Sequence, residues 1–320
     1  ALRAAVQRLE DPLLRRIAGY HLGWLDADGA PVHGGGGKAF RPTLAVLSAE
    51  AGGGTASDGV PAAVAVELVH NFSLLHDDIM DRDVERRHRP TGWVVFGDGQ
   101  AILAGNAMLT AAVQALVDAG PAAQRAVPHL LASVQDLIRG QSEDLELEGR
   151  SRVSLDDVLH MEGGKTAALL ACACSIGAVM VGGSDDVVAG LFAVGFELGM
   201  AFQLVDDILG ITGDPSATGK SSSSDVRAGK RSAPIVAALD SGTPAGARLA
   251  RLLDGGPPAS EDDVRLATKL IDEAGGLGWA ASEADRWLSG ALARLEDLDI
   301  PPDAAAELAD LARYVVERDR

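Results

Sequence analysis

Residues 74–81 carry three aspartates at the end of an apolar segment with helical periodicity. Asp77 and Asp81 are four residues apart, so on a helix they share one face, one turn from each other. Two carboxylates placed in this way repel each other unless a cation lies between them. Mg²⁺ prefers hard oxygen ligands and takes one or two carboxylates, with water and phosphate oxygens as its other ligands. The spacing therefore predicts a metal site, with a solvated acidic helix end as the alternative.

Residues 202–207 form a second acidic cluster at the end of a long apolar helical segment. Asp206 and Asp207 close it, and Gln203 stands one turn earlier. Two carboxylate clusters at the ends of buried helices are harder to explain as solvated surface than one. If they face each other across a helical bundle, they can hold several Mg²⁺ ions around one diphosphate.

Basic residues stand beside the acidic clusters or in glycine-containing loops, in a chain with a formal net charge of −18. The acidic balance disfavours nucleic acid and anionic lipid as general partners. Arginine suits bidentate phosphate contacts and lysine acts as a point charge, so the set predicts local phosphate binding. A P-loop is excluded, because Ala39 follows Lys38 where Ser or Thr is required. The basic set is Lys38, Arg41, Arg86, Arg87, His88, Arg89, Lys165, Lys220 and Lys230.

Helical periodicity dominates the 320 residues, and no convincing strand or long linker is predicted. With 47% apolar but only 4% aromatic residues, the core must depend on close helix packing by small side chains. We therefore expect one all-α domain over residues 1–320. The expected helical blocks are 2–25, 42–52, 59–82, 98–118, 122–147, 154–182, 185–212, 231–240, 244–253, 260–274, 278–296 and 302–318.

Two strongly apolar stretches, 166–183 and 187–205, are interpreted as buried helices and not as membrane spans. The first consists mostly of small residues, and the second contains Glu197 and Gln203. No transmembrane segment is therefore expected. Cys172 and Cys174 lie two apart on a helix, so they cannot readily bridge each other and are expected to be buried thiols. A cytoplasmic location fits this cysteine use.

Taken in order, these motifs resemble those of the trans-prenyl diphosphate synthase family. They are Gly-Gly-Lys-x-x-Arg-Pro at 36–42, Asp-Asp-x-x-Asp at 77–81, Arg86-Arg87, Gly-Lys-Thr at 164–166, Phe-Gln-x-x-Asp-Asp at 202–207, Gly-Lys at 219–220 and Lys230. The match spans roughly residues 34–235, and the C-terminal helices carry no matched motif. The resemblance implies an all-α fold of the class I isoprenoid synthase type, a single large helical bundle surrounding a central cavity.

The resemblance also implies a role for each matched position. The residues expected to bind isopentenyl diphosphate are Lys38, Arg41, His70 and Arg87. The expected ligands of three Mg²⁺ ions are Asp77, Asp81 and Asp206, with Asp78 and Asp207 in support. The residues expected to hold the allylic diphosphate are Arg86, Lys165, Lys220 and Lys230. Thr166 and Gln203 are expected to turn oxygen dipoles toward a developing carbocation.

The implied activity is the head-to-tail condensation of isopentenyl diphosphate with C5, C10 or C15 allylic diphosphates in a cavity that excludes water. Phe72 and Ser73 stand five and four residues before Asp77 and are expected to form the floor of that cavity. An aromatic followed by a small residue there resembles geranylgeranyl diphosphate synthases, so a C20 product is expected, with a C15 farnesyl product second. A homodimer is also implied.

The chain departs from the family pattern at two positions. Gly210 stands where the second acidic motif usually has a third Asp, and His88 where Gly commonly follows the arginine pair. Two rival functions remain open. A class I terpene cyclase would usually replace Asp206-Asp207 with an Asn/Ser/Glu metal motif and would not need Lys38 and Arg41. A non-catalytic subunit of a heteromeric synthase would tend to lose the first acidic motif or the arginine pair, and this chain keeps both.

Overall fold

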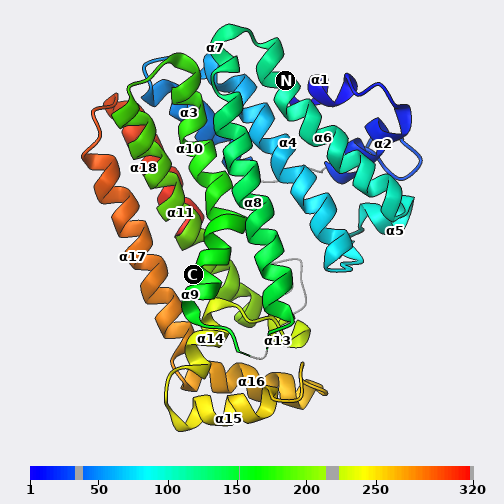
Figure 1. Ribbon diagram of the computed structural model, residues 1–320, viewed down its shortest axis with the longest axis vertical. Helices are drawn as coiled ribbons and strands as arrows, with labels where there is room; N and C mark the ends of the chain where they lie inside the picture. The colour runs from blue at the N-terminus through cyan, green and yellow to red at the C-terminus, as the bar shows by residue number, and fades with distance from the viewer. Residues whose placement is uncertain (33–38, 151, 214–222, 318–320) are drawn as a thin grey trace. The chain divides into compact units, whose positions relative to one another are not determined.

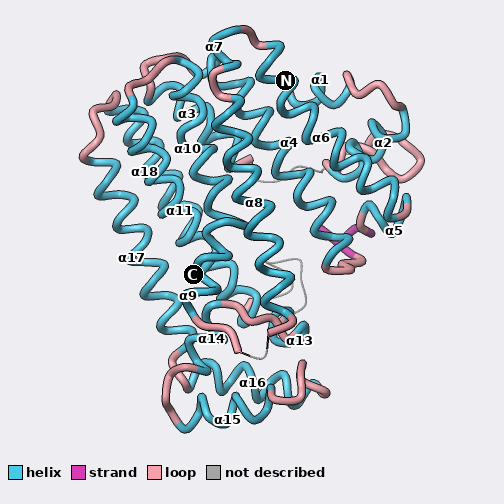
Figure 2. The backbone as a smooth tube through the Cα atoms, in the orientation of Figure 1, coloured by secondary structure: helices cyan, strands magenta, loops and turns pink. Residues whose placement is uncertain are grey.

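The computed structural model describes residues 1–32, 39–150, 152–213 and 223–317, and it is built largely of helices (Figure 1). Figure 2 shows the same chain by secondary structure, with one short hairpin as its regular strand content in the described part. The all-α prediction is confirmed. The chain divides into two compact units, and four helices contribute residues to both. These four are α8 (Val127–Glu148), α10 (Ala168–Val181), α11 (Asp185–Thr212) and α18 (Pro302–Glu317).

The first unit comprises residues 1–134, 172–192 and 298–308. In its core α4 packs against α3 and α6, with Leu68, Leu75 and Met108 fully buried. A Cβ atom on Gly59 would come within 2.7 Å of the Val46 Cα, so glycine permits this close approach of two backbones. The elements are α1 (Leu2–Gln7), α2 (Pro12–His21), α3 (Phe40–Ala51), α4 (Ala56–Met80), β1 (Glu85–Arg86), β2 (Arg89–Pro90), α5 (Gly92–Phe96), α6 (Asp98–Asp118) and α7 (Pro121–Gln124).

The second unit comprises residues 135–171, 193–297 and those from 309 onward. One of its cores is formed by the side chains of Ile211, Val226, Ile235, Leu249 and Leu270. Its elements, besides parts of the four shared helices, are α9 (Leu155–Glu162), η1 (Gly163–Ala167), α13 (Ser224–Ala228), α14 (Ala233–Leu239), α15 (Pro244–Leu253), α16 (Glu261–Glu273) and α17 (Gly276–Glu296).

The predicted and observed elements differ in four places. The expected helix 122–147 is two helices, α7 and α8, and the expected loop 213–230 contains α13. The expected helix 2–25 is two helices, because Asp11 caps α2 by accepting from the Leu13 and Leu14 amides and Pro12 takes the first helical position. The expected loop between residues 83 and 98 contains the β1–β2 hairpin and α5. The expected helix 154–182 is continuous from Leu155 to Val181, with a π-helical turn, η1, in its middle.

By length and composition alone, three helices of the described chain could cross a membrane. They are Asp98–Asp118, Leu155–Val181 and Asp185–Thr212, and 39%, 78% and 50% of their apolar windows are buried inside the protein. The rest of the protein covers most of the apolar surface of Leu155–Val181, so this surface does not need lipid around it. Asp98–Asp118, which is α6, keeps the largest share of its window exposed.

Candidate diphosphate and metal-binding sites

The C-terminal end of α4 carries the first acidic motif, with its aspartates in two different environments. Asp77 and Asp81 are half-buried, whereas Asp78 is 1% exposed. The Arg86 Nε donates to Asp78 Oδ1 over 2.7 Å. Burial raises the pKa of Asp78 to about 6, against the opposing effect of Arg86. Asp78 therefore faces the protein and holds Arg86, while Asp77 and Asp81 keep access to solvent.

The β1–β2 hairpin presents the arginine pair and explains the unusual residue that follows it. Arg86 pairs with Arg89, leaving Arg87 and His88 as the two turn residues. Both turn residues have left-handed backbones, with φ of 53° and 59°. A two-residue hairpin turn of this kind requires positive φ at both positions, which glycine adopts most easily. Histidine is among the residues enriched in this conformation, so His88 can keep the turn in place of glycine.

Three residues expected at the isopentenyl diphosphate site meet in the first unit. Arg41 on α3 lies 3.4 Å from His70 on α4, measured from Nη1 to Nε2. Burial, and then the charges of Arg41 and Arg87, hold the pKa of His70 well below its usual value. His70 is thus a neutral imidazole among guanidinium groups. Lys38, the fourth residue of this set, lies outside the described residues.

In the second unit, the π-turn η1 places Lys165 and Thr166 beside acceptors from other helices. Lys165 Nζ lies 2.5 Å from Asp144 Oδ2, and Thr166 Oγ1 donates to Gln203 Oε1 over 2.6 Å. A Cβ atom on Gly140 would collide with the Lys165 backbone, so glycine allows α8 to approach η1 this closely. π-turns often mark functional positions in helices.

The second acidic motif also has one half-buried and one buried aspartate. Asp206 is half-buried, and Asp207 is 5% exposed. The Gln203 Nε2 donates to Asp207 Oδ1 over 2.7 Å, and the Ala233 amide donates to Asp207 Oδ2 over 3.1 Å. Asp207 thereby links Gln203 to the start of α14, much as Asp78 holds Arg86. Lys230 lies between α13 and α14, and Lys220 falls outside the described residues.

The missing third aspartate of this motif has a structural counterpart. A Cβ atom on Gly210 would collide with the carboxylate of Asp225, the second residue of α13. The charge of Asp225 also raises the pKa of Asp207. The Asp225 carboxylate therefore occupies the space that a side chain at position 210 would enter.

Three acidic residues of these sites were not singled out from the sequence. Asp144 pairs with Lys165, Asp225 lies against Gly210, and Glu162 interacts with Asp207. Glu162 is 3% exposed, and its Oε2 is buried without a hydrogen-bond partner in the protein. Its position directly before Gly163-Gly164-Lys165 was the available signal. Asp144 is 21 residues from its partner Lys165, and Asp225 is 15 residues from Gly210. Single-sequence periodicity cannot reveal contacts of this kind.

The Glu162–Asp207 pair should make stability depend on pH. Burial raises the pKa of Asp207 to about 7 and that of Glu162 well above its usual value. The folded state then keeps protons that the unfolded chain releases near pH 4. The contribution of the pair to the free energy of unfolding is therefore complete below pH 4 and is lost as pH rises through 7 and beyond. Each retained proton changes the free energy of unfolding by about 1.4 kcal/mol per pH unit. Glu162→Gln should flatten the loss between pH 5 and 8.

Urea unfolding in metal-free buffer at several pH values measures this slope. The exposed Glu296→Gln variant on α17 is the matched control and should keep the wild-type slope. Equal slopes for Glu162→Gln and the wild type would show that Glu162 holds no extra proton in the folded state.

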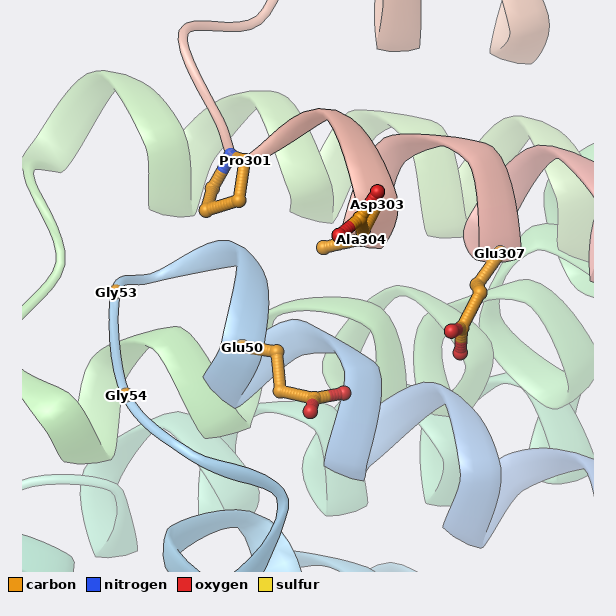
Figure 3. A pocket seen from close by; sticks show the side chains of 7 residues that line it. All are labelled: Glu50, Gly53, Gly54, Pro301, Asp303, Ala304 and Glu307. Atoms are coloured by element: carbon orange, nitrogen blue, oxygen red, sulfur yellow. The ribbon is translucent and has the colours of Figure 1, made fainter.

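A pocket of about 270 Å³ lies in the first unit, away from these motifs (Figure 3). Glu50 of α3 and Asp303 and Glu307 of α18 contribute carboxylates to it, and no basic residue is among its lining residues. Such a pocket repels a diphosphate, so it is not a candidate for the substrate site.

Comparison with known proteins supplies the deciding observation. The family model for polyprenyl synthetases matches residues 24–271, more than two thirds of the chain. The chain belongs to the polyprenyl synthetase family. The (2E,6E)-farnesyl diphosphate synthase of Mycobacterium tuberculosis is 46% identical over 321 residues, covering 99% of this chain and 89% of the relative. The geranylgeranyl diphosphate synthase of the same species is 45% identical over 307 residues, covering 95% and 87%.

The fold of the chain also matches solved structures of polyprenyl synthetases. The polyprenyl synthetase from Streptomyces coelicolor A3(2) superimposes with a TM-score of 0.94 at 49% identity, covering 98% of this chain and 95% of that one. A geranylgeranyl pyrophosphate synthase from Corynebacterium glutamicum, complexed with isoprenyl diphosphate and magnesium, gives a TM-score of 0.84 at 28% identity, covering 99% and 97%. The isoprenoid synthase fold is therefore confirmed, and this member of the family is a prenyltransferase.

The residues of this polyprenyl synthetase suit the Mg²⁺ ions on which the family depends. Among the described residues, no group of three or more His, Cys, Asp or Glu side chains could hold a metal ion alone. Mg²⁺ does not need such a cage, because it takes one or two carboxylates and completes its shell with water and substrate phosphates. Asp77 and Asp81, half-buried and one helical turn apart, offer that donor set.

Proposed function

We propose that this prenyltransferase condenses isopentenyl diphosphate with allylic diphosphates and releases a C20 product, geranylgeranyl diphosphate. The observation that carries the C20 assignment is Phe72, which is buried on α4 and lies edge-on to His76 at a centroid distance of 5.1 Å. An aromatic ring one turn before the acidic motif limits how far a growing chain can extend along the helix. Relatives named for C15, C20 and C25 products all resemble the chain, so the length assignment depends on this residue.

The proposed metal ligands are Asp77, Asp81 and Asp206, and the complete site would hold three Mg²⁺ ions. These ions would neutralise the allylic diphosphate and make it a good leaving group. Asp78 and Asp207 are buried and bonded to Arg86 and Gln203. We assign them a supporting role that works through those two partners.

In the proposed mechanism, Arg86, Lys165, Lys220 and Lys230 hold the allylic diphosphate, and its loss leaves an allylic cation. The hydroxyl of Thr166 donates to Gln203 Oε1, and the amide of Gln203 donates to Asp207, so both side chains are fixed in orientation. Their oxygen atoms then stabilise the developing positive charge without reorganisation. The double bond of isopentenyl diphosphate attacks C1 of the cation, and a proton passes to the departing diphosphate.

Two separate diphosphate sites distinguish condensation from cyclisation. Arg87→Gln should raise KM for isopentenyl diphosphate, and Lys165→Gln should raise KM for the allylic substrate. Each change should be about ten- to a hundredfold, because one charge-assisted hydrogen bond is lost. Each variant should leave the other KM within about twofold.

Steady-state kinetics with one substrate varied at a time measures this division. Lys269→Gln, an exposed lysine paired with Glu273 on α16, is the control and should change neither constant. If both KM values rise together in both variants, the two substrates share one site and the proposed division is wrong.

We further propose that the enzyme is a cytoplasmic homodimer that associates through α6. The exposed face of this helix carries Ile102, Leu103 and Val117, with exposed fractions of 41%, 51% and 39%. Asn106 and Gln114 lie on the same face, and such polar side chains find no partners in lipid. A second copy can cover the apolar residues and bond to the polar ones in a two-fold contact.

Leu103→Glu should therefore convert the dimer to a monomer, because a carboxylate would be buried opposite its symmetry mate. Sedimentation velocity at micromolar concentration measures the mass. The control is Val60→Glu, at another exposed apolar position in the first unit, which should stay dimeric. A wild-type enzyme that sediments as a monomer would contradict this assembly.

A further inference from the structure

The end of α2 is tied to the β1–β2 hairpin by contacts that the motifs do not include. The Tyr20 hydroxyl donates to the Pro90 carbonyl over 2.7 Å. Arg89 Nη2 donates to the Leu25 carbonyl over 2.8 Å, and its guanidinium stacks on the Tyr20 ring at 4.2 Å. Tyr20 is the penultimate residue of α2, so these bonds hold the last residue, His21, beside the hairpin whose turn carries Arg87.

The His21 imidazole lies in the same electrostatic environment as the cationic cluster of the first unit. The charges of Arg86 and Arg87 lower the pKa of His21, and His21 in turn lowers the pKa of His70. Burial, followed by the charges of these two arginines, lowers the pKa of His21 to about 3. The ring is therefore neutral at physiological pH and carries one N–H donor.

The Nε2 atom of His21 is buried and has no hydrogen-bond partner in the protein. A buried polar atom left unpaired costs about 1–3 kcal/mol, so such an atom in a binding region calls for a ligand. Two acids act on Arg87, and each already accepts a hydrogen bond: Asp78 Oδ1 from Arg86 Nε, and Glu67 Oε1 from Asn71 Nδ2 over 2.8 Å. The other oxygen of Asp78, Oδ2, is buried without a hydrogen-bond partner in the protein. Arg41, Arg86 and Arg87 make the surroundings favourable for an anion.

We propose that His21 is an additional binding residue for the diphosphate of isopentenyl diphosphate, donating a hydrogen bond from Nε2 to a phosphate oxygen. This assignment rests on the proposed function, in which Arg41, His70 and Arg87 bind the same group. The contact adds a second neutral imidazole, beside that of His70, to a site whose other ligands are cations. Since His21 comes from α2, it also makes the N-terminal helices part of the substrate site.

Two substitutions separate binding from packing. His21→Phe keeps a planar ring of similar size but removes the donor, and His21→Gln keeps a donor on a flexible chain. His160→Gln is the matched control, since its side chain is 68% exposed in the second unit. The measurements are KM for each substrate, kcat, the thermal midpoint, and calorimetric titration of the full-length enzyme with isopentenyl diphosphate alone.

The expected result is specific to one substrate. His21→Phe should weaken calorimetric binding of isopentenyl diphosphate and raise its KM about tenfold or more, with kcat and the allylic KM within about twofold. His21→Gln should lose less, and His160→Gln nothing. A His21→Phe enzyme with unchanged isopentenyl diphosphate affinity, or with both KM values raised equally, would overturn the assignment. A wild-type enzyme that condenses nothing would instead refute the proposed function.

Discussion

Replacing Asp77 by Asn should lower kcat about a thousandfold while the enzyme stays folded. Asp77 is half-buried at the end of α4, so an amide of the same shape fits there. The amide lacks the negative charge that a Mg²⁺ ion requires of its protein ligand. A bound metal contributes several kcal/mol of charge stabilisation as the diphosphate departs, and each 1.36 kcal/mol is a factor of ten in rate.

Single-turnover rates at increasing Mg²⁺ concentration measure this effect and separate it from binding. The rate of Asp77→Asn should recover only partly at high Mg²⁺. Asp186→Asn, at an exposed acid in the first turn of α11, is the control and should behave as the wild type. Full activity of Asp77→Asn at ordinary Mg²⁺ would remove Asp77 from the set of metal ligands.

Replacing Phe72 by Ala should lengthen the main product beyond C20. Phe72 lies about one helical turn before Asp77, which places it deeper along α4 by roughly 5–8 Å. Removing the ring opens space where the tail of a growing prenyl chain would otherwise stop. The reverse change, Ser73→Phe, should shorten the product to C15, because a ring then fills the adjacent position.

Chain lengths are read by chromatography of the dephosphorylated products. Phe72→Ala also leaves a cavity, which costs about 3–5 kcal/mol of stability, so the thermal midpoint is measured alongside. Phe192→Ala, which loses a ring packed on His129 elsewhere in the first unit, should keep the C20 product. Unchanged product lengths in both Phe72→Ala and Ser73→Phe would show that α4 does not form the floor.

Helical periodicity was enough to predict the all-α fold, and the resemblance of the motifs to a known family indicated most of the proposed site. Asp77 lies in the last turn of α4 and Asp81 is the C-cap residue of that helix, and Thr166 and Gln203 meet although 37 residues separate them. The different roles of the two aspartates in each pair could not be predicted, since the burial of Asp78 and Asp207 depends on tertiary packing that motif spacing does not show. The hairpin was missed because two-residue strands have no periodicity to detect.

Family patterns also left the departures unexplained until backbone geometry was available. His88 occupies a left-handed turn position that histidine tolerates, and Asp225 fills the space beside Gly210. His21 carries no motif at all. It becomes a candidate only because Tyr20 and Arg89 fasten α2 to the hairpin.

The most direct test of the central claim is an incubation of the purified enzyme with Mg²⁺, labelled isopentenyl diphosphate and each of the C5, C10 and C15 allylic diphosphates in turn. We expect label in a linear C20 product from every primer, with no product when either substrate is omitted. Cyclic hydrocarbon from an allylic diphosphate alone, or no turnover unless a second polypeptide is added, would contradict the claim.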